Sequence, residues 1–218
     1  MFQIIKPDDR AANKALLKDM FENRYRVVVE QWGWTIPGIA PGHDEDQFDT
    51  EDTIYSVVVD EDSGRVVGSS RLNPTTRPHM LSELFADYCD LQPYPELASV
   101  WECSRYVIDK TMFKDPVREF RHRAQIGIGL TQCCLDNDIS ELSWLTHKSF
   151  YNLVLAVWET EPLGLARRGD DGSAWIAARS KIDAAALSRQ LSRFNNAEEV
   201  VAAHLGKKGK TDREGKAA

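Results

Sequence analysis

A chain of 218 residues is long enough for one α/β domain with a substantial core, and its 42% hydrophobic and 28% charged residues are ordinary for a soluble globular protein. The net charge of -7 argues against nucleic acid as a partner, and no apolar run approaches the ~18 residues needed to span a bilayer. The first ten residues contain no apolar signal core, so we expect a cytoplasmic protein with no membrane partner.

The four cysteines give no sign of a metal site. Cys133 and Cys134 are adjacent, and Cys89 and Cys103 lack the spacing of zinc ligands. Buried core thiols are the simpler interpretation, so we predict no bound metal.

The chain shows no internal repeat and no long linker, which predicts a single domain over residues 1–205. Residues 206–218 carry five basic residues and no large apolar side chain, so they cannot bury enough surface to become ordered. We expect a disordered tail there. A nucleic-acid-binding arm is the alternative, and the acidic body of the protein argues against it.

Apolar residues at helical spacing predict a first helix over about 12–30. Glu22 and Arg26 lie four residues apart on its polar face and can form an ion pair. Arg24 instead falls on the apolar stripe, seven residues after Leu17 and four before Val28. A guanidinium there either has an anionic partner or extends to the rim of the helix, and the sequence leaves both open.

Strands and helices then alternate along the chain. Two β-branched segments flank a turn at 62–64, and Gly68 in the second indicates a bulge or a close backbone approach. Asp115 and Pro116 predict the start of a long helix. In all, strands are expected at 53–60, 65–72, 100–108, 141–146 and 174–178, and helices after the first at 115–135, 149–158 and 184–194. This mixture predicts an α/β sheet with helices on both faces.

The loop after the first helix combines an indole with carboxylates. Trp34 is followed by Asp44, Glu45, Asp46 and Asp49. Clustered negative charge beside an aromatic face suits a cationic ligand such as an ammonium or a sulfonium. A solvated acidic loop is the alternative interpretation.

The segment 100–106 is the second feature with chemical potential. Glu102 and Arg105 are costly in a strand this apolar unless they are paired or functional. Regular alternation would place residues three apart on opposite faces of the sheet. A bulge between them would turn both side chains to one face and direct backbone N–H groups toward a ligand.

These residues also carry a resemblance. The segments Asp46-Gln47-Phe48-Asp49, Gly68-Ser69-Ser70-Arg71-Leu72, Pro74-Thr75-Thr76-Arg77-Pro78-His79-Met80-Leu81 and Trp101-Glu102-Cys103-Ser104-Arg105-Tyr106, in this order after Arg24 and Trp34, resemble the LuxI-type acyl-homoserine-lactone synthases. The match is close from about residue 24 to 107 and loose beyond.

The resemblance implies a GNAT-like acyltransferase fold with a central mixed, twisted sheet and helices on both faces. It also implies a quorum-sensing function, with S-adenosylmethionine and an acyl thioester as substrates and no cofactor. The residues implied for S-adenosylmethionine are Arg24, Val28, Trp34, Asp46, Asp49, Arg71, Phe85 and Arg105. The family usually has phenylalanine at the position of Val28, so this pocket is either wider here or filled by a neighbour.

The expected chemistry joins the amine of S-adenosylmethionine to the acyl group and then closes a lactone, releasing methylthioadenosine. Glu102 is the candidate base, with Ser104 and Arg105 beside it. Asp46 and Asp49 hold the cationic substrate or order the loop, with Arg24 and Arg105 as partners. Arg71 either pairs with that loop or touches the ligand. Cys103 as a covalent acyl carrier is disfavoured, because no histidine is near it in sequence.

The acyl chain is expected against mainly apolar residues from four segments. These are Met80, Leu81, Trp101, Trp144, Thr146, Phe150 and Leu153. Either Trp144 or Thr146 occupies the position at which the family often has threonine, and Trp144 is equally well a core residue. The sequence leaves open the acyl chain, the choice between an acyl-carrier protein and acyl-CoA, and two rivals, a noncatalytic binding protein and an N-acyltransferase for another amine.

Overall fold

The computed structural model describes residues 1–169 and 172–203. The predicted tail, residues 206–218, lies outside the described residues. Within the described part of the chain, no helix has the length and apolarity needed to cross a membrane.

One mixed sheet organises the described residues. Its strands follow the order β1-β2-β3-β4-β5-β8-β6, with β7 pairing β8. Their bounds are Phe2–Ile5 (β1), Ile54–Val59 (β2), Val66–Pro74 (β3), Val100–Ile108 (β4), Glu141–His147 (β5), Glu159–Pro162 (β6), Arg167–Arg168 (β7) and Ala174–Lys181 (β8). All neighbours are antiparallel except β4 and β5.

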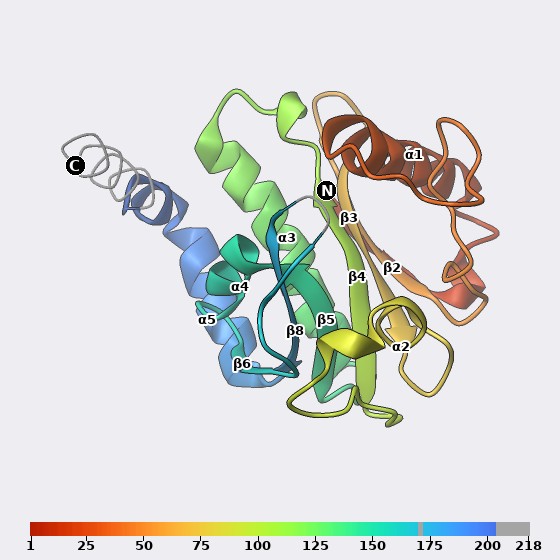
Figure 1. The fold of residues 1–218 in the computed structure, drawn as a ribbon. Coiled ribbons are helices and arrows are strands. Elements are labelled where there is room, and N and C mark those ends of the chain that lie inside the picture. The colour runs from red at the N-terminus through yellow and green to blue at the C-terminus, as the bar shows by residue number, and fades with distance from the viewer. Residues whose placement is uncertain (170–171, 204–218) are drawn as a thin grey trace.

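Helices cover both faces of this sheet (Figure 1). Their bounds are Lys14–Tyr25 (α1), Met80–Leu84 (α2), Pro116–Leu135 (α3), Lys148–Val154 (α4) and Ala184–Asn195 (α5). α1 and α2 lie on one face, and α3, α4 and α5 lie on the other. α1 continues into a π-helical turn, Arg26–Gln31, whose wider geometry buries Val27 and Val28 together.

The main core lies between the sheet and α3. Ile126 and Leu130 of α3 pack against alternate residues of the strands, as period-2 burial requires. The ring of Phe2 occupies the space where a side chain at Gly129 would lie, only 1.6 Å from an ideal Cβ position. The absence of a side chain at Gly129 therefore allows β1 to close one edge of the sheet against α3.

The parallel neighbours β4 and β5 are in register over only three residues each. The pairs are Val100 with Glu141, Trp101 with Leu142 and Glu102 with Ser143. Beyond Glu102 the two strands part, although both continue for several residues. The parting opens the sheet on the C-terminal side of Glu102, at its centre.

Most of the predicted elements are confirmed, and β4 has the predicted bounds. Asp115 caps α3 by accepting from the N–H of Val117, as expected. The predicted Glu22–Arg26 pair is wrong, because Arg26 instead lies 3.7 Å from the buried carboxylate of Asp109. The sequence analysis did not find the short strands β1, β6 and β7.

Candidate active site

Three arginines and three aspartates form a closed ring of ion pairs between α1 and the sheet, which we call the arginine–aspartate ring. Its members are Arg24, Asp44, Arg105, Asp46, Arg71 and Asp49 in that order around the ring. Arg71 and Arg105 each contact two carboxylates of the ring, and Arg24 contacts all three, because its Nη2 also lies 4.0 Å from Oδ2 of Asp46. All six side chains are 5% exposed or less, so the alternative interpretation of a solvated acidic loop is wrong for the three aspartates, whereas Glu45 is exposed.

Arg24 has the most extensive contacts in the ring. Its Nη1 lies 2.8 Å from Oδ1 of Asp49 and its Nη2 lies 3.1 Å from Oδ2 of the same carboxylate. Nη2 also donates to Oδ1 of Asp44 at 3.3 Å. The structure thereby decides between the two sequence interpretations: Arg24 is buried and paired, and it does not extend to the rim.

The other two arginines tie the acidic loop to β3 and β4. Arg71 donates from Nη1 to Asp46 at 2.6 Å and from Nε to the Ser104 hydroxyl at 3.0 Å. Arg105 donates from Nε to Asp44 at 3.0 Å and from Nη2 to Asp46 at 2.8 Å. Arg71 therefore pairs with the acidic loop, one of the two roles left open by the sequence.

Electrostatics keep the ring charged despite its burial. Burial alone would raise the pKa of the Asp49 carboxyl, but Arg24 and Arg71 outweigh burial and hold that pKa below its usual range. Burial alone would lower the pKa of Arg24, and Asp49 and Asp44 reverse this and raise it. The ring is therefore a set of compensated charges whose first effect is to order the acidic loop.

β4 has a bulge, but it lies at Arg105 and Tyr106 and not between Glu102 and Arg105 as predicted, because the pairing with β3 is regular from Glu102 to Ser104. Arg71 pairs with Ser104 and Ser69 pairs with Val107, so β4 has one more residue than β3 in this interval. Arg105 has a φ of 52°, in the left-handed region that residues other than glycine rarely adopt. The bulge turns the Arg105 side chain toward α2, on the same face as Glu102.

Glu102 is a buried carboxylate at the point where β4 and β5 part. Its Oε1 accepts from the N–H of Leu81 at 2.6 Å and its Oε2 from the N–H of Met80 at 3.3 Å. Burial raises the pKa of Glu102, although His79, Arg71 and these two amides act in the opposite direction. The carboxyl is therefore suited to exchange a proton nearer to neutral pH than an exposed glutamate would.

Trp34 and Val28 lie beside the ring. Val28 forms a small buried cluster with Val27 and with Val107 of β4, and Trp34 packs against this cluster. The indole of Trp34 also lies 5.5 Å, centroid to centroid, from that of Trp175 on β8. Trp34 thus spans the opening between β4 and β5, and Trp175 is a neighbour that the sequence analysis missed.

The remaining predicted residues divide between the two faces of the sheet. Leu81 and Phe85 pack in a small cluster with Leu145, on the α2 side. Met80 lies on that side too, with its sulfur 3.0 Å from Nη2 of Arg71.

The opposite face holds most of the predicted acyl-pocket residues. Trp101, Trp144 and Phe150 belong to the main core on the α3 side, and the Trp144 indole donates to Ser180. Thr146, two residues after Trp144, shares its face of β5, and Leu153 is half-buried on α4. The predicted pocket therefore requires a path through the opening between β4 and β5.

Two of the four cysteines are the predicted core thiols, and Cys89 and Cys103 are partly buried. Cys133 and Cys134 are buried, and burial raises the pKa of the Cys103 thiol to about 12. Because the thiolate is the nucleophilic form, this environment disfavours Cys103 as a covalent acyl carrier.

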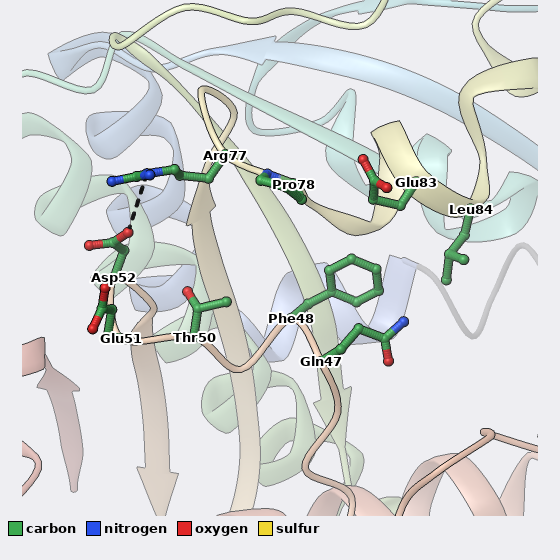
Figure 2. Close-up of a pocket in the computed structure, with 9 residues that line it drawn as sticks. All are labelled: Gln47, Phe48, Thr50, Glu51, Asp52, Arg77, Pro78, Glu83 and Leu84. Atoms are coloured by element: carbon green, nitrogen blue, oxygen red, sulfur yellow. Dashed lines mark ion pairs between the residues drawn. The ribbon is translucent and has the colours of Figure 1, made fainter.

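A surface cavity of about 510 Å³ lies on the outer side of the acidic loop (Figure 2). Its walls are Gln47, Phe48, Thr50, Glu51, Asp52, Arg77, Pro78, Glu83 and Leu84, and the exposed Arg77–Asp52 ion pair lies along one side. None of the predicted substrate residues lines this cavity. The candidate site lies instead on the inner side of the loop, around the ring and Glu102.

The geometry agrees with a comparison to known families. The sequence model of the autoinducer synthase family matches residues 8–149. The chain belongs to the autoinducer synthase family. The isovaleryl-homoserine lactone synthase of Bradyrhizobium diazoefficiens is 33% identical over 140 residues, which cover 61% of this chain and 59% of that protein. The acyl-homoserine-lactone synthase of Ralstonia solanacearum is 42% identical over 84 residues, 38% of this chain and 41% of the relative.

Solved structures extend the likeness beyond these segments. The CoA-dependent acyl-homoserine lactone synthase BjaI, with SAM and isopentyl-CoA, superposes with a TM-score of 0.79 and 26% identity over 89% of both chains. The acyl-homoserine-lactone synthase LasI shares the fold, with a TM-score of 0.74 at 22% identity over 87% of this chain and 93% of that chain. The predicted α/β fold, with a mixed sheet between helices, is confirmed.

Proposed function

We propose that the protein is an acyl-homoserine-lactone synthase, an acyltransferase that uses S-adenosylmethionine and an acyl thioester to make a quorum-sensing signal. One observation carries the proposal most directly. The buried carboxylate of Glu102 lies where β4 and β5 part, with the Arg105 bulge on the same strand and the arginine–aspartate ring beside it. Membership of the autoinducer synthase family supports the same reaction.

The first step is acyl transfer to nitrogen. Glu102 takes a proton from the α-ammonium group, directly or through a water, and the free amine attacks the thioester carbonyl. The C–N bond forms, the C–S bond breaks, and the thiol carrier leaves. A base with a raised pKa suits this step because an ordinary carboxylate would be a weak proton acceptor near neutral pH.

The bulge in β4 would stabilise the oxyanion that forms during acyl transfer. Ser70, Arg105 and Tyr106 lie outside the regular register of β3 and β4, so backbone amides at the bulge are available for the developing oxyanion. We assign the other predicted catalytic residue, Ser104, to holding Arg71 through its hydroxyl. Arg105, with its left-handed backbone, links the bulge to the acidic loop.

The second step closes the lactone. The carboxylate of the acylated product attacks its own γ-carbon, and the C–S bond to the sulfonium breaks to release methylthioadenosine. Trp34 and Val28 would contact the sulfonium end of the substrate, since a cation is favoured over an indole face. The arginine–aspartate ring then acts mainly by fixing the loop that follows Trp34. Phe85 would contact the substrate from the α2 side.

The acyl donor is the finer part of the proposal. BjaI is described as CoA-dependent and contains isopentyl-CoA, which favours an acyl-CoA donor here over an acyl-carrier protein. The chain would pass through the opening between β4 and β5 toward Trp144, Thr146, Phe150 and Leu153. Apolar side chains of the main core beyond this opening would form the walls for it.

The test is incubation of the pure protein with S-adenosylmethionine and matched panels of acyl-CoA and acyl-carrier-protein donors. We expect methylthioadenosine, free thiol and an acyl-homoserine lactone in equal amounts by mass spectrometry. Acyl transfer to a different amine without methylthioadenosine would identify a general N-acyltransferase. Binding of S-adenosylmethionine without any turnover would identify a noncatalytic binding protein.

A further inference from the structure

Gln190 of α5 is a buried carboxamide for which the proposed reaction has no assigned role. It lies one turn after Ala186, which belongs to the main core, and it is only 5% exposed. The adjacent Leu191 is 43% exposed, so α5 directs a glutamine inward and a leucine outward. Burial of a polar side chain in an apolar core is costly, so packing alone does not explain this arrangement.

The oxygen of the Gln190 carboxamide has no partner. Oε1 is buried and makes no hydrogen bond within residues 1–169 and 172–203. The hydroxyl of Tyr106 cannot supply one, because it donates its hydrogen to the carbonyl of Arg123 at 2.7 Å. Oε1 of Gln125 on α3 is unpaired as well, but two acceptors cannot pair with each other. The guanidinium of Arg123 is held by Glu119, one turn earlier on α3. An unpaired buried acceptor calls for a partner from outside the chain.

The carboxamide of Gln190 and the hydroxyl of Tyr106 face the same point on α3. An ideal Cβ atom at Gly127 would lie 3.2 Å from Nε2 of Gln190 and 3.5 Å from the hydroxyl oxygen of Tyr106. Because Gly127 has no side chain, these two polar groups meet beside bare helix backbone. The meeting point lies between α3, α5 and β4.

Tyr106 connects this point with the opening between β4 and β5. It lies on β4 four residues beyond Glu102, where the parallel pairing has already ended. Its ring lies 5.4 Å, centroid to centroid, from that of Phe150, one of the residues proposed to contact the acyl chain. Tyr106 is also only partly buried, although β4 is a central strand. An acyl chain that passes the opening along Phe150 would therefore reach Tyr106 and end at Gln190.

We propose that Gln190 is a specificity-determining residue that selects acyl thioesters with a hydroxyl group at the far end of the chain. This inference rests on the proposed function. A hydroxyl both donates and accepts, so it satisfies the carboxamide in either orientation of its oxygen and nitrogen. A methyl end would leave Oε1 of Gln190 unpaired, and a charged end would bring an uncompensated charge into the core. The hydroxyl takes no part in the acyl transfer and forms no covalent bond.

The first test is competition in the wild type between an ω-hydroxyacyl-CoA and the alkyl acyl-CoA that is one carbon longer. The two donors have the same number of heavy atoms and differ at the far end of the chain. Such pairs are compared over a series of chain lengths, with the lactones quantified by mass spectrometry. At the length that reaches Gln190, we expect kcat/KM to be roughly 10-fold higher for the hydroxyl donor. The absence of a hydroxyl preference at every length would overturn the proposal.

Gln190→Leu separates recognition from packing. Leucine has a similar volume and no polar atom, so we expect a folded protein that melts at the wild-type temperature or above, with the hydroxyl preference lost. Gln132→Leu is the matched control, because Gln132 lies on the exposed side of α3, where it donates to Asp136 at 2.8 Å. This control should keep the wild-type preference. A Gln190→Leu protein that also keeps it would overturn the proposal.

Gly127→Ala provides a second variant that leaves Gln190 in place. Alanine favours a helix interior, so α3 should remain folded. The new methyl group would lie 3.2 Å from Nε2 of Gln190, which is tight enough to displace the carboxamide. We expect a weaker hydroxyl preference and a shorter preferred donor. An unchanged preference and an unchanged length would contradict the location of the chain end.

Binding of the same donors without S-adenosylmethionine measures the preference without turnover. By calorimetry, we expect the ω-hydroxyacyl-CoA to bind roughly 10-fold more tightly than its alkyl counterpart, and Gln190→Leu to bind both equally. If this preference is present but no donor releases methylthioadenosine, the proposed function fails and the role of Gln190 stands. If methylthioadenosine is released but neither method shows a preference, the role of Gln190 fails alone.

Discussion

The guanidinium of Arg24 and the carboxylate of Asp49 face each other in a bidentate pair, with Nη1–Oδ1 and Nη2–Oδ2 distances of 2.8 and 3.1 Å. The pair joins α1 to the loop that carries the acidic residues, and both side chains are buried. It fixes the loop between Trp34 and β2 against the sheet. Substitutions in this pair should therefore report on both folding and substrate binding.

Arg24→Lys should be poorly tolerated. A lysine ammonium cannot reproduce the planar two-bond contact with Asp49, and it leaves a buried carboxylate undersatisfied. We expect a loss of stability of about 3 kcal/mol and a raised KM for S-adenosylmethionine, measured by denaturant unfolding and by turnover. Arg26→Lys is the control, because Arg26 is one-third exposed and makes one 3.7 Å contact with Asp109. Equal behaviour of the two variants would contradict a special role for the bidentate pair.

Asp49→Asn should change how stability depends on acid. The native pKa of Asp49 lies below its ordinary value of 3.8, so its contribution is present above that pH and is lost as pH falls toward the native pKa. We expect the wild type to lose stability steeply below about pH 4, and the variant to be weaker at neutral pH with a shallower acid slope. The check is the unfolding midpoint from pH 3 to 7. Parallel curves for the two proteins would show that Asp49 is not the responsible group.

Glu102→Gln should separate proton acceptance from structure. Glutamine keeps an oxygen to accept from the amides of Met80 and Leu81 but cannot take a proton. We expect a rate loss of roughly 10²–10⁴-fold with folding intact. In the wild type, activity should fall as pH decreases through the raised pKa of Glu102, above its ordinary 4.5. Near-normal turnover in the glutamine variant would restrict Glu102 to capping α2.

Trp144→Phe should alter the preferred acyl chain. The smaller ring frees volume just beyond the point where β4 and β5 part, and it removes the indole bond to Ser180. Each added buried CH₂ is worth about 0.8 kcal/mol, so donors two carbons longer should gain roughly 15-fold in relative specificity.

The measurement for Trp144→Phe is competition between two donors, with products identified by mass spectrometry. Trp158→Phe is the control, because its indole is equally buried but bonds to Thr131 of α3. An unchanged product ratio would leave Thr146 as the better candidate for the pocket.

Patterns of hydrophobicity and capping predicted the long elements, because β4 and α3 carry strong local signals. They did not predict β1, β6 and β7, which are too short and too polar to show a period. That β4 has a bulge followed from the cost of two charges on one apolar strand, which is a local argument, but its position at Arg105 and Tyr106 did not.

Partners of charged residues were harder to predict. The sequence indicated that Arg24 needs an anion and that carboxylates follow, but not that Arg24, Arg71 and Arg105 share three of them in a ring. Glu22 and Arg26 were predicted to pair from spacing alone. The buried carboxylate of Asp109 competes for Arg26, and that competition appears only in three dimensions. Trp175 was missed for the same reason.

The six charged positions of the arginine–aspartate ring should constrain one another during evolution. Each side chain compensates at least two neighbours, so loss of any one leaves an unbalanced unit charge in a buried environment, which a second single substitution can seldom repair. The six positions should therefore be retained or replaced together among descendants of one ancestor. Variation would then concentrate in the apolar walls beyond Glu102, where a lineage can change the signal it makes while keeping the charged framework intact.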